Sequence, residues 1–395
     1  MHDFSGPYSL YLHVPFCRHK CGYCDFNTYA GNEALQPDYV RALSSEIGQF
    51  AESAGERLPL HTIFFGGGTP SLLSPPQLGM IFSAIHEAFT LVPNIEITLE
   101  ANPGTVMPDS LKSMHAMGVN RLSLGMQSAH PGELRLLERQ HSFQEVDLAM
   151  QWARKAGFEN INLDLIFGLP HQRLMDWQDS VKLALSLMPQ HLSLYNLTLE
   201  HGTPLESLVG RGILPHPDPD IGADMFLWAM EYLGSEGWRH YEISNWAREG
   251  VNGQSFTCAH NMQYWRNYPY IGLGAGAHGF VGGYRVADVL SPAAYIERCF
   301  EGAPGGFPRT PATVSAIQVD EYLEMQETMM MGLRLLDEGV SSTAFARRFG
   351  KRLEEIFLKE VSKLHGLDLI EKKEDRWLLT AKGRMLGNQV FLEFV

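Results

Sequence analysis

The sequence predicts an α/β protein with a partial barrel of six β/α units, followed by an accessory region and a C-terminal winged-helix-like domain. Two patterns support this fold class. In the first half of the chain, short runs of β-branched and aromatic residues alternate with segments whose apolar residues recur at helical spacing. Alternating strands and helices form parallel sheets, and six units instead of eight indicate an open or partial barrel.

Six segments have the composition of strands, at 8–16, 61–65, 96–100, 121–124, 160–167 and 191–199. The segments between them predict helices over 37–54, 75–89, 108–117, 143–156 and 176–187. Several of these begin with proline or an acidic residue, as the first turn of a helix commonly does. The residues just past the strands are small or polar, and active sites of parallel barrels are built at this end.

The composition changes after about residue 205, where a Pro/Gly-rich connector, 210–219, precedes a predicted helix over 220–234. An aromatic-rich region over 238–295 reads as an irregular accessory layer on the barrel. Helical runs and a hairpin then follow in winged-helix order, at 319–336, 343–349, 353–365 and 367–379. We therefore expect a barrel domain at 1–205, an accessory region at 206–305 and a winged-helix-like domain at 306–395.

Charge and hydropathy exclude several classes of protein. The 395 residues include 45 acidic and 31 basic ones, for a net charge of -14, which argues against nucleic acid as the main partner. The charge-balanced wing, 371–376, agrees with this. No apolar run is long enough for a membrane span, and the N-terminus lacks the features of a signal peptide. We expect a cytoplasmic protein without transmembrane segments, which leaves peripheral membrane contact open.

Three of the five cysteines, Cys17, Cys21 and Cys24, form a C-x3-C-x2-C motif directly after the first predicted strand. Three thiolates at this spacing can converge on one inorganic centre. A structural zinc site needs four protein ligands, so zinc would have to recruit His13, His19 or a distant cysteine. An iron–sulfur cluster on three thiolates leaves one iron open to a small chelating molecule. The motif favours the cluster over zinc.

Polar residues at the predicted strand ends form a second set of candidates. The glycine-rich turn 66–70 lets backbone amides approach a ligand closely, although by itself it reads as a tight β–α loop. Glu100, Gln127, Arg139 and Asp164 would individually be ordinary hydrogen-bonding or ion-pairing residues. Their shared position at one end of the barrel is what makes them candidates.

Taken together, the motifs resemble those of radical S-adenosylmethionine proteins, and more narrowly the oxygen-independent coproporphyrinogen oxidase branch. The motifs lie in order at 11–24, 66–70, 100–103, 123–128 and 162–170. The first reads Tyr11-x-His13-x-Pro15-Phe16-Cys17-x3-Cys21-x2-Cys24. The accessory and winged regions also have counterparts in this branch, so the similarity covers nearly the whole chain.

The resemblance implies a 4Fe-4S cluster on Cys17, Cys21 and Cys24, with S-adenosylmethionine chelating the open iron. It also implies contacts to S-adenosylmethionine from several elements. Tyr11 and Tyr23 would lie beside it, and Gly67, Gly68 and Thr69 would meet its methionyl amine. Glu100, Gln127, Arg139 and Asp164 would contact its methionyl and ribosyl parts, with Thr198 near the adenine. A zwitterionic sulfonium ligand needs both carboxylates and an arginine, so this set is chemically consistent.

Two departures from the oxidases narrow the resemblance. Phe26 stands where they carry a further cysteine, and only sixteen residues precede Cys17, whereas the oxidases have a longer N-terminal arm. Both features are typical of the HemW-type haem chaperones, whose His-Asn-x-x-Tyr-Trp motif is present at 260–265. His260 offers an imidazole to haem iron, and Tyr264 and Trp265 offer flat apolar surface.

Alternatives to this haem site remain open. The 260–265 segment also reads as an aromatic loop in which His260 caps a turn, and Cys258 is either a second candidate ligand or a small hydrophobe. The methionines at 325 and 329–331 would line an apolar pocket or, more in keeping with helical spacing, pack in a core. Because 260–265 lies far from the cysteine motif, we expect two separate sites.

The resemblance implies a chaperone that binds haem and delivers it to acceptor haemoproteins of respiration. An enzymatic alternative is radical oxidative decarboxylation of a porphyrinogen, as in the coproporphyrinogen oxidases. A third hypothesis is a zinc-stabilised interaction module without iron. No catalytic residue is assigned by the sequence.

Overall fold

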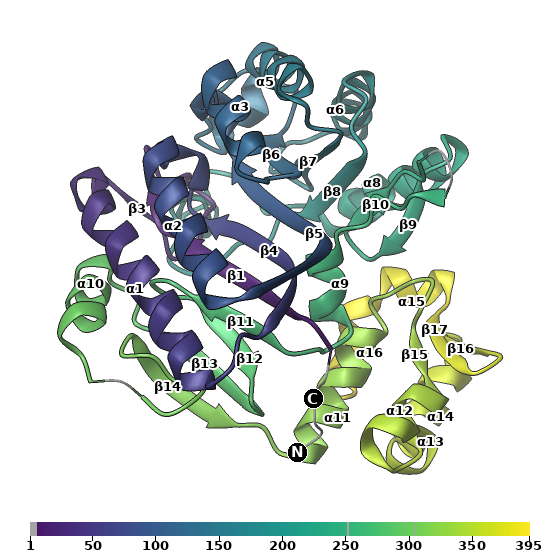
Figure 1. The fold of residues 1–395 in the computed structure, drawn as a ribbon. Helices are drawn as coiled ribbons and strands as arrows, with labels where there is room; N and C mark the ends of the chain where they lie inside the picture. The colour runs from purple at the N-terminus through teal and green to yellow at the C-terminus, as the bar shows by residue number, and fades with distance from the viewer. Residues whose placement is uncertain (1–5, 251–252, 304) are drawn as a thin grey trace.

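The computed structural model describes residues 6–250, 253–303 and 305–395, so the N-terminal residues considered for a signal peptide lie outside it. Its main sheet has twelve strands in the order β14-β13-β12-β11-β1-β4-β5-β6-β7-β8-β10-β9 (Figure 1). The six predicted strands are parallel neighbours in this sheet. They are β1 (Tyr8–Val14), β4 (Pro59–Gly67), β5 (Thr90–Ala101), β6 (Arg121–Gln127), β7 (Asn160–Phe167) and β8 (His191–Asn196). The predicted α/β partial barrel is confirmed.

The five predicted helices are also present and cover the outer face of the barrel (Figure 1). They are α1 (Gln36–Ala54), α2 (Pro75–Ala88), α3 (Pro108–Ala116), α5 (Phe143–Ala156) and α6 (Leu174–Ser186). In α5, Ser142 and Glu145 form a capping box, and Gly157 ends the helix in the left-handed conformation. The short helix α4 (Pro131–Leu136) was not expected, because six residues are too few to show a helical period.

Strand periodicity decides which side chains reach the barrel interior. In β7, Ile161, Leu163 and Leu165 belong to the main hydrophobic core, which also contains Trp177 of α6. Alternate residues of a strand point to opposite faces, so Asn162 and Asp164 point away from these helices. A polar barrel interior is therefore the direct result of polar residues at every second position of apolar strands.

The region after residue 205 extends the sheet at both edges, and the expectation of an irregular layer is wrong. Helices α7 (Pro204–Gly210) and α8 (Pro219–Ser235) lead to β9 (Arg239–Glu242) and β10 (Asn245–Ala247). Strand β10 pairs with β8, and β9 pairs with β10 at the edge of the sheet. After α9 (Ala259–Trp265), β11 (Tyr270–Leu273) pairs in parallel with β1. Then follow β12 (His278–Val281), β13 (Tyr284–Asp288), α10 (Pro292–Glu301) and β14 (Thr313–Gln318).

Glycines concealed these strands in the sequence, because they interrupt the apolar periodicity of β11 and β12. One of them, Gly272, is required by packing, since a Cβ there would lie 1.9 Å from the His278 carbonyl oxygen. The close approach of β11 and β12 thus depends on a residue that weakens the strand signal. The three domain boundaries stay a prediction.

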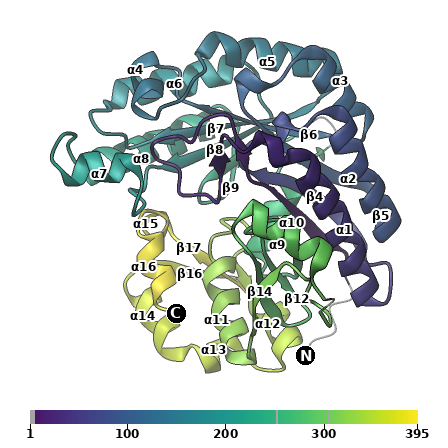
Figure 2. The ribbon, with the colours of Figure 1, turned by 90° about the vertical axis from the view of Figure 1, so that its left-hand side faces the viewer.

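The C-terminal part has its own hydrophobic core. Its elements are α11 (Glu321–Gly332), β15 (Val340–Ser341), α12 (Ser342–Phe349), α13 (Leu353–Ile356), α14 (Leu358–Gly366), β16 (Ile370–Lys373), β17 (Arg376–Leu379), α15 (Ala381–Met385) and α16 (Gly387–Leu392). The predicted hairpin is β16–β17, which β15 completes to three strands. Met325 and Met329 are buried in this core, as core packing predicts. Figure 2 shows this part below the barrel, and α11 contacts α9.

Smaller elements complete the chain. They are β2 (Phe16–Cys17), β3 (Tyr29–Ala30) and the 3-10 turns Glu33–Leu35, Pro70–Leu72 and Pro103–Thr105. Within the described ranges, no helix has the length and apolar character needed to span a bilayer.

Candidate functional site

The cysteine motif lies at the carboxyl end of β1, with all three thiols free and partly exposed. Thr69 donates its hydroxyl to the Cys17 sulfur (3.6 Å), and Arg139 donates Nη1 to the Cys21 sulfur (3.6 Å). Burial raises the pKa of Cys17, and the nearby Cys24 and Cys21 raise it further. Three soft donors facing a guanidinium fit the cysteine ligands of an iron–sulfur cluster.

The histidines considered as zinc ligands have other partners. His13 Nε2 donates to the Asn27 carbonyl (2.9 Å), so its Nδ1 accepts from the Tyr11 hydroxyl (2.9 Å). His19 pairs with Glu138 at 3.3 Å. Across the part of the chain that the structure describes, no three His, Cys, Asp or Glu side chains, the three cysteines included, are grouped to hold a single metal ion such as zinc. The thiolates of a 4Fe-4S cluster each bind a different iron, so they need not converge on one ion. Neither histidine therefore lies ready as a fourth ligand beside the cysteines.

The glycine-rich turn after β4 packs directly against the cysteine loop. The amides of Gly68 and Thr69 donate to the carbonyls of Val14 and Phe16. A Cβ on Gly68 would lie 2.6 Å from the Phe16 carbonyl oxygen, so only glycine permits this contact. Gly67 has a φ of 107° and donates its amide to Glu100 Oε2 at 3.2 Å. The turn thereby connects the cysteine loop to Glu100 on β5.

Two carboxyl groups face the barrel interior. Burial raises the pKa of Glu100 to about 8, and the nearby charge of Asp164 adds to this rise. Burial also raises the pKa of Asp164, which accepts hydrogen bonds from Ser123 Oγ (3.0 Å) and Asn162 Nδ2 (2.8 Å). The ionisation of two buried carboxyl groups costs less free energy when a cation lies between them. The pair is therefore suited to a cationic ligand.

The remaining residues of the predicted S-adenosylmethionine set lie at the same end of the barrel. Arg139 Nη2 donates to the Gly125 carbonyl (2.9 Å), which places the guanidinium between β6 and the cysteine loop. Gln127, at the end of β6, is buried with a φ of 63°. Tyr23 packs beside Leu137 and Leu169 in a small apolar cluster. Thr198 follows β8 and is exposed.

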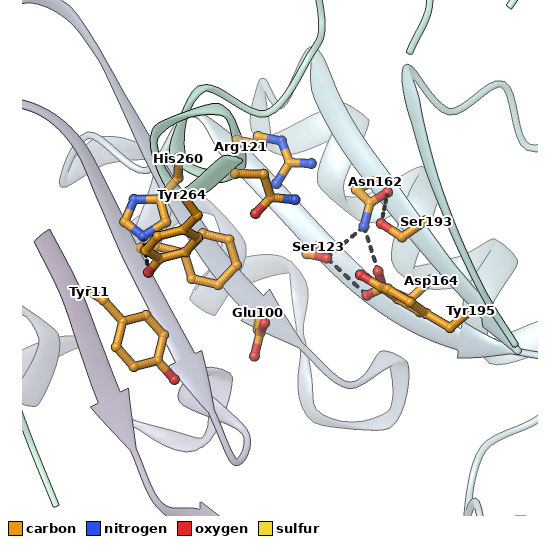
Figure 3. A pocket seen from close by; sticks show the side chains of 12 residues that line it. Tyr11, Glu100, Arg121, Ser123, Asn162, Asp164, Ser193, Tyr195, His260 and Tyr264 are labelled. Carbon is orange, nitrogen blue, oxygen red and sulfur yellow. Dashed lines mark hydrogen bonds between the residues drawn. The ribbon is translucent and has the colours of Figure 1, made fainter. Parts of the chain in front are cut away.

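A cavity of about 210 Å³ lies inside the barrel (Figure 3). Its lining residues come from six strands and from α9; they are Tyr11, Phe64, Glu100, Arg121, Ser123, Asn162, Asp164, Ser193, Tyr195, His260, Asn261 and Tyr264. Members of the predicted S-adenosylmethionine set and of the 260–265 motif therefore line the same cavity. None of the three cysteines lines this cavity, so the expectation of a haem segment separate from the cysteine motif stays a prediction. Helix α9 lies against β4 and brings its side chains to the barrel interior beside Glu100 and Asp164.

His260 is 1% exposed and is hydrogen-bonded through both ring nitrogens. Nδ1 lies 2.8 Å from Thr62 Oγ1, and Nε2 lies 2.8 Å from the Tyr264 hydroxyl. Burial lowers the pKa of His260 to about 3, so the imidazole is neutral. The Phe64 ring packs against it, with a centroid distance of 5.1 Å. A neutral imidazole is the form that binds iron.

The other residues of this motif have different environments. Trp265 does not line the cavity, and Arg334 lies over its ring at 4.4 Å. Cys258 is fully buried at the N-cap position of α9, without a side-chain capping bond, and its sulfur lies 3.6 Å from a Glu96 carboxylate oxygen. The predicted aromatic surface is therefore divided, with Tyr264 facing the cavity and Trp265 facing the C-terminal part of the chain.

Several polar cavity residues were not predicted as site residues, although Ser123, Asn162 and Asn261 lie within the motifs named from the sequence. They are Arg121, Ser123, Asn162, Ser193, Tyr195 and Asn261. Five of these are strand residues, and their signal is the polar side chain at every second position of an otherwise apolar strand, as in Arg121-Leu-Ser123 and Asn162-Leu-Asp164. Attention to strand ends alone overlooks positions deeper in the barrel.

Comparison with known proteins agrees with this geometry. Residues 11–184 match the radical SAM superfamily, and residues 323–386 match the HemN C-terminal domain. The protein named heme chaperone HemW of Bacillus subtilis is 37% identical over 98% of this chain and 99% of its own length. Its namesake from Escherichia coli is 35% identical over 98% of both chains.

A solved structure of coproporphyrinogen III oxidase, HemN, from Escherichia coli superposes with a TM-score of 0.83 over 98% of this chain and 90% of its own. At 22% identity this likeness concerns the fold alone. The two HemW proteins match over nearly their whole length at higher identity. On this basis the chain belongs to the HemW family of haem chaperones, within the radical S-adenosylmethionine superfamily.

Proposed function

We propose that this protein binds haem in the cytoplasm and transfers it to acceptor haemoproteins of respiration, and that it carries a 4Fe-4S cluster and S-adenosylmethionine. One observation carries the proposal. His260 and Tyr264 of the haem motif line the same cavity as Glu100 and Asp164. The printed names of the HemW relatives, heme chaperones, point in the same direction.

In this proposal, Cys17, Cys21 and Cys24 would hold the cluster, and the amine and carboxylate of S-adenosylmethionine would chelate its open iron. Glu100 and Asp164 attract the cationic groups of that ligand, which favours ionisation of both carboxyl groups. Arg139, beside the Cys21 sulfur, provides the positive charge that a carboxylate or a cluster thiolate requires.

The hydrogen bonds around His260 support Nε2 as the nitrogen that binds haem iron. Thr62 donates its only hydroxyl proton to Ser9 Oγ (2.5 Å), so it can only accept from His260 Nδ1. The ring proton is therefore on Nδ1, and Nε2 accepts from the Tyr264 hydroxyl. The lone pair of Nε2 is therefore occupied by the hydrogen bond from the Tyr264 hydroxyl, and both residues line the cavity.

The test of the proposal is haem titration, followed by Soret absorbance, of wild type and His260→Ala. We expect the substitution to weaken haem binding at least tenfold and to shift the Soret band, because an axial ligand is lost. Iron and sulfide content should not change. His86→Ala, on the exposed side of α2, is the control. An unchanged affinity and spectrum for His260→Ala would remove this residue as the ligand.

Tyr264→Phe is expected to have the opposite effect on haem affinity. The substitution keeps the ring in the cavity but removes the hydroxyl that occupies His260 Nε2. Haem iron then no longer competes with a hydrogen bond worth about 0.5–1.5 kcal/mol, so affinity should rise roughly two- to tenfold. The same titration measures this. Weaker binding by Tyr264→Phe would show that the hydroxyl supports haem and does not compete with it.

A further inference from the structure

Arg121 is a buried cation whose guanidinium has no hydrogen-bonding or ion-pairing partner among the described residues. It begins β6, is 2% exposed and lines the cavity beside Asn162 and Tyr264 (Figure 3). Among the residues that the structure describes, none forms a hydrogen bond or an ion pair with its guanidinium, and Nε is fully enclosed. Burying a charge without compensation is strongly unfavourable, so such groups normally have an ion or ligand as partner.

Two carboxylates whose charges act on Arg121, those of Glu96 and Asp164, accept hydrogen bonds from other donors. Glu96 accepts from the backbone amides of Ala259 and His260, each at 3.1 Å, and thereby caps the start of α9. Asp164 accepts from Ser123 and Asn162, as described above. Neither carboxylate forms an ion pair with Arg121 in the described part of the chain, although both lie within electrostatic range. Burial by itself lowers the pKa of Arg121, but the nearby Cys258, Glu96, Tyr241 and Asp164 raise it above its ordinary value. The guanidinium therefore faces the cavity with acidic groups in its neighbourhood but with no hydrogen bond or ion pair among the described residues.

A guanidinium in this position selects a planar anion with two acceptor oxygens, which is the geometry of a carboxylate. The Asn261 side chain lines the same cavity and can donate from its amide. At about 210 Å³ the cavity is smaller than the roughly 300–1,000 Å³ that enclose a whole drug-sized ligand. It has room for a carboxylate-bearing arm of a larger molecule.

We propose that Arg121 forms a carboxylate subsite in this cavity and binds a propionate arm of haem. The assignment to haem rests on the proposed function, since His260 lines the same cavity. S-adenosylmethionine is the other carboxylate-bearing candidate. Its carboxylate is expected at Arg139 beside the cysteine loop, whereas Arg121 lies at the start of β6, away from that end of the barrel.

The experiment compares two ligands that differ only at the carboxylates, haem and haem dimethyl ester, on the anaerobically prepared full chain. We expect wild type to bind haem about 10- to 100-fold more tightly than the ester, because a hydrogen bond to a charged group changes affinity by roughly this factor. Arg121→Met removes the charge at similar side-chain length and should abolish this preference. Arg121→Lys should retain part of it, and serves as the test if Arg121→Met does not fold. Arg57→Met, outside the cavity, is the matched control.

A second arm repeats the comparison with S-adenosylmethionine and its decarboxylated analogue. If Arg121→Met loses the preference for S-adenosylmethionine over its decarboxylated analogue but keeps the preference for haem over its ester, the haem assignment is overturned. The methionyl carboxylate is then placed at Arg121. If Arg121→Met shows the same preference as wild type in both ligand pairs, the carboxylate subsite itself is overturned. If wild type binds no haem and His260→Ala changes nothing, the proposed function fails, and the second arm still reports whether Arg121 binds a carboxylate.

Discussion

Replacing any one of Cys17, Cys21 and Cys24 by serine is expected to abolish the broad visible absorption of an iron–sulfur cluster. In the proposed assignment the cluster would have three protein thiolates and one open iron, so the loss of one thiolate would leave a second iron without a protein ligand. Bound iron should fall from about four atoms per chain to near background. Iron and acid-labile sulfide analysis after anaerobic reconstitution measures the effect.

Cys258→Ser and Cys299→Ser are the matched controls, because both cysteines are buried away from the motif. Cys258 contacts Glu96, and the Cys299 carbonyl accepts from Gln49. Both variants should keep the full cluster. Loss of the cluster in either one, with the protein still folded, would contradict the three-thiolate assignment. Retention of a full cluster in a Cys17, Cys21 or Cys24 variant would contradict it equally.

Glu100→Gln is expected to change stability and S-adenosylmethionine binding in opposite directions. The pKa of Glu100 rises from 4.5 to about 8 on folding, so the folded state holds a proton that the unfolded state releases between these values. The free energy of unfolding of wild type therefore falls as pH increases through this window and stays low above it. A neutral glutamine removes this loss, which is on the order of 5 kcal/mol at most.

The measurement is urea unfolding of wild type and Glu100→Gln without S-adenosylmethionine, below, within and above this pH window. We expect the variant to be more stable only at the alkaline end. Binding of S-adenosylmethionine should weaken at least about tenfold, because the cationic ligand loses a carboxylate partner. Glu87→Gln, on the exposed side of α2, should leave both quantities unchanged. A parallel pH dependence for wild type and Glu100→Gln would show that Glu100 ionises normally in the fold.

The sequence by itself determined the parts of this protein that depend on local pattern. Strands β1, β4, β5, β6, β7 and β8 and the helices between them follow from apolar periodicity and helix-start residues, which act over a few neighbouring positions. The cysteine motif is equally local, since C-x3-C-x2-C brings three thiols onto one loop whatever the rest of the chain does. Glu100 and Asp164 could be selected because parallel strands end at a common edge.

Only the tertiary structure decided which distant segments meet. The parallel pairing of β11 with β1 joins positions about 260 residues apart. Gly272, which permits the close approach of β11 and β12, weakens the local strand pattern. The pairing of β11 with β1 and the packing of α9 on β4 bring His260 to Thr62 and turn Tyr264 into the cavity, while Trp265 faces Arg334. Arg121 was overlooked for the same reason. Whether a buried cation has a partner depends on every chain segment that surrounds it, and no local pattern contains that information.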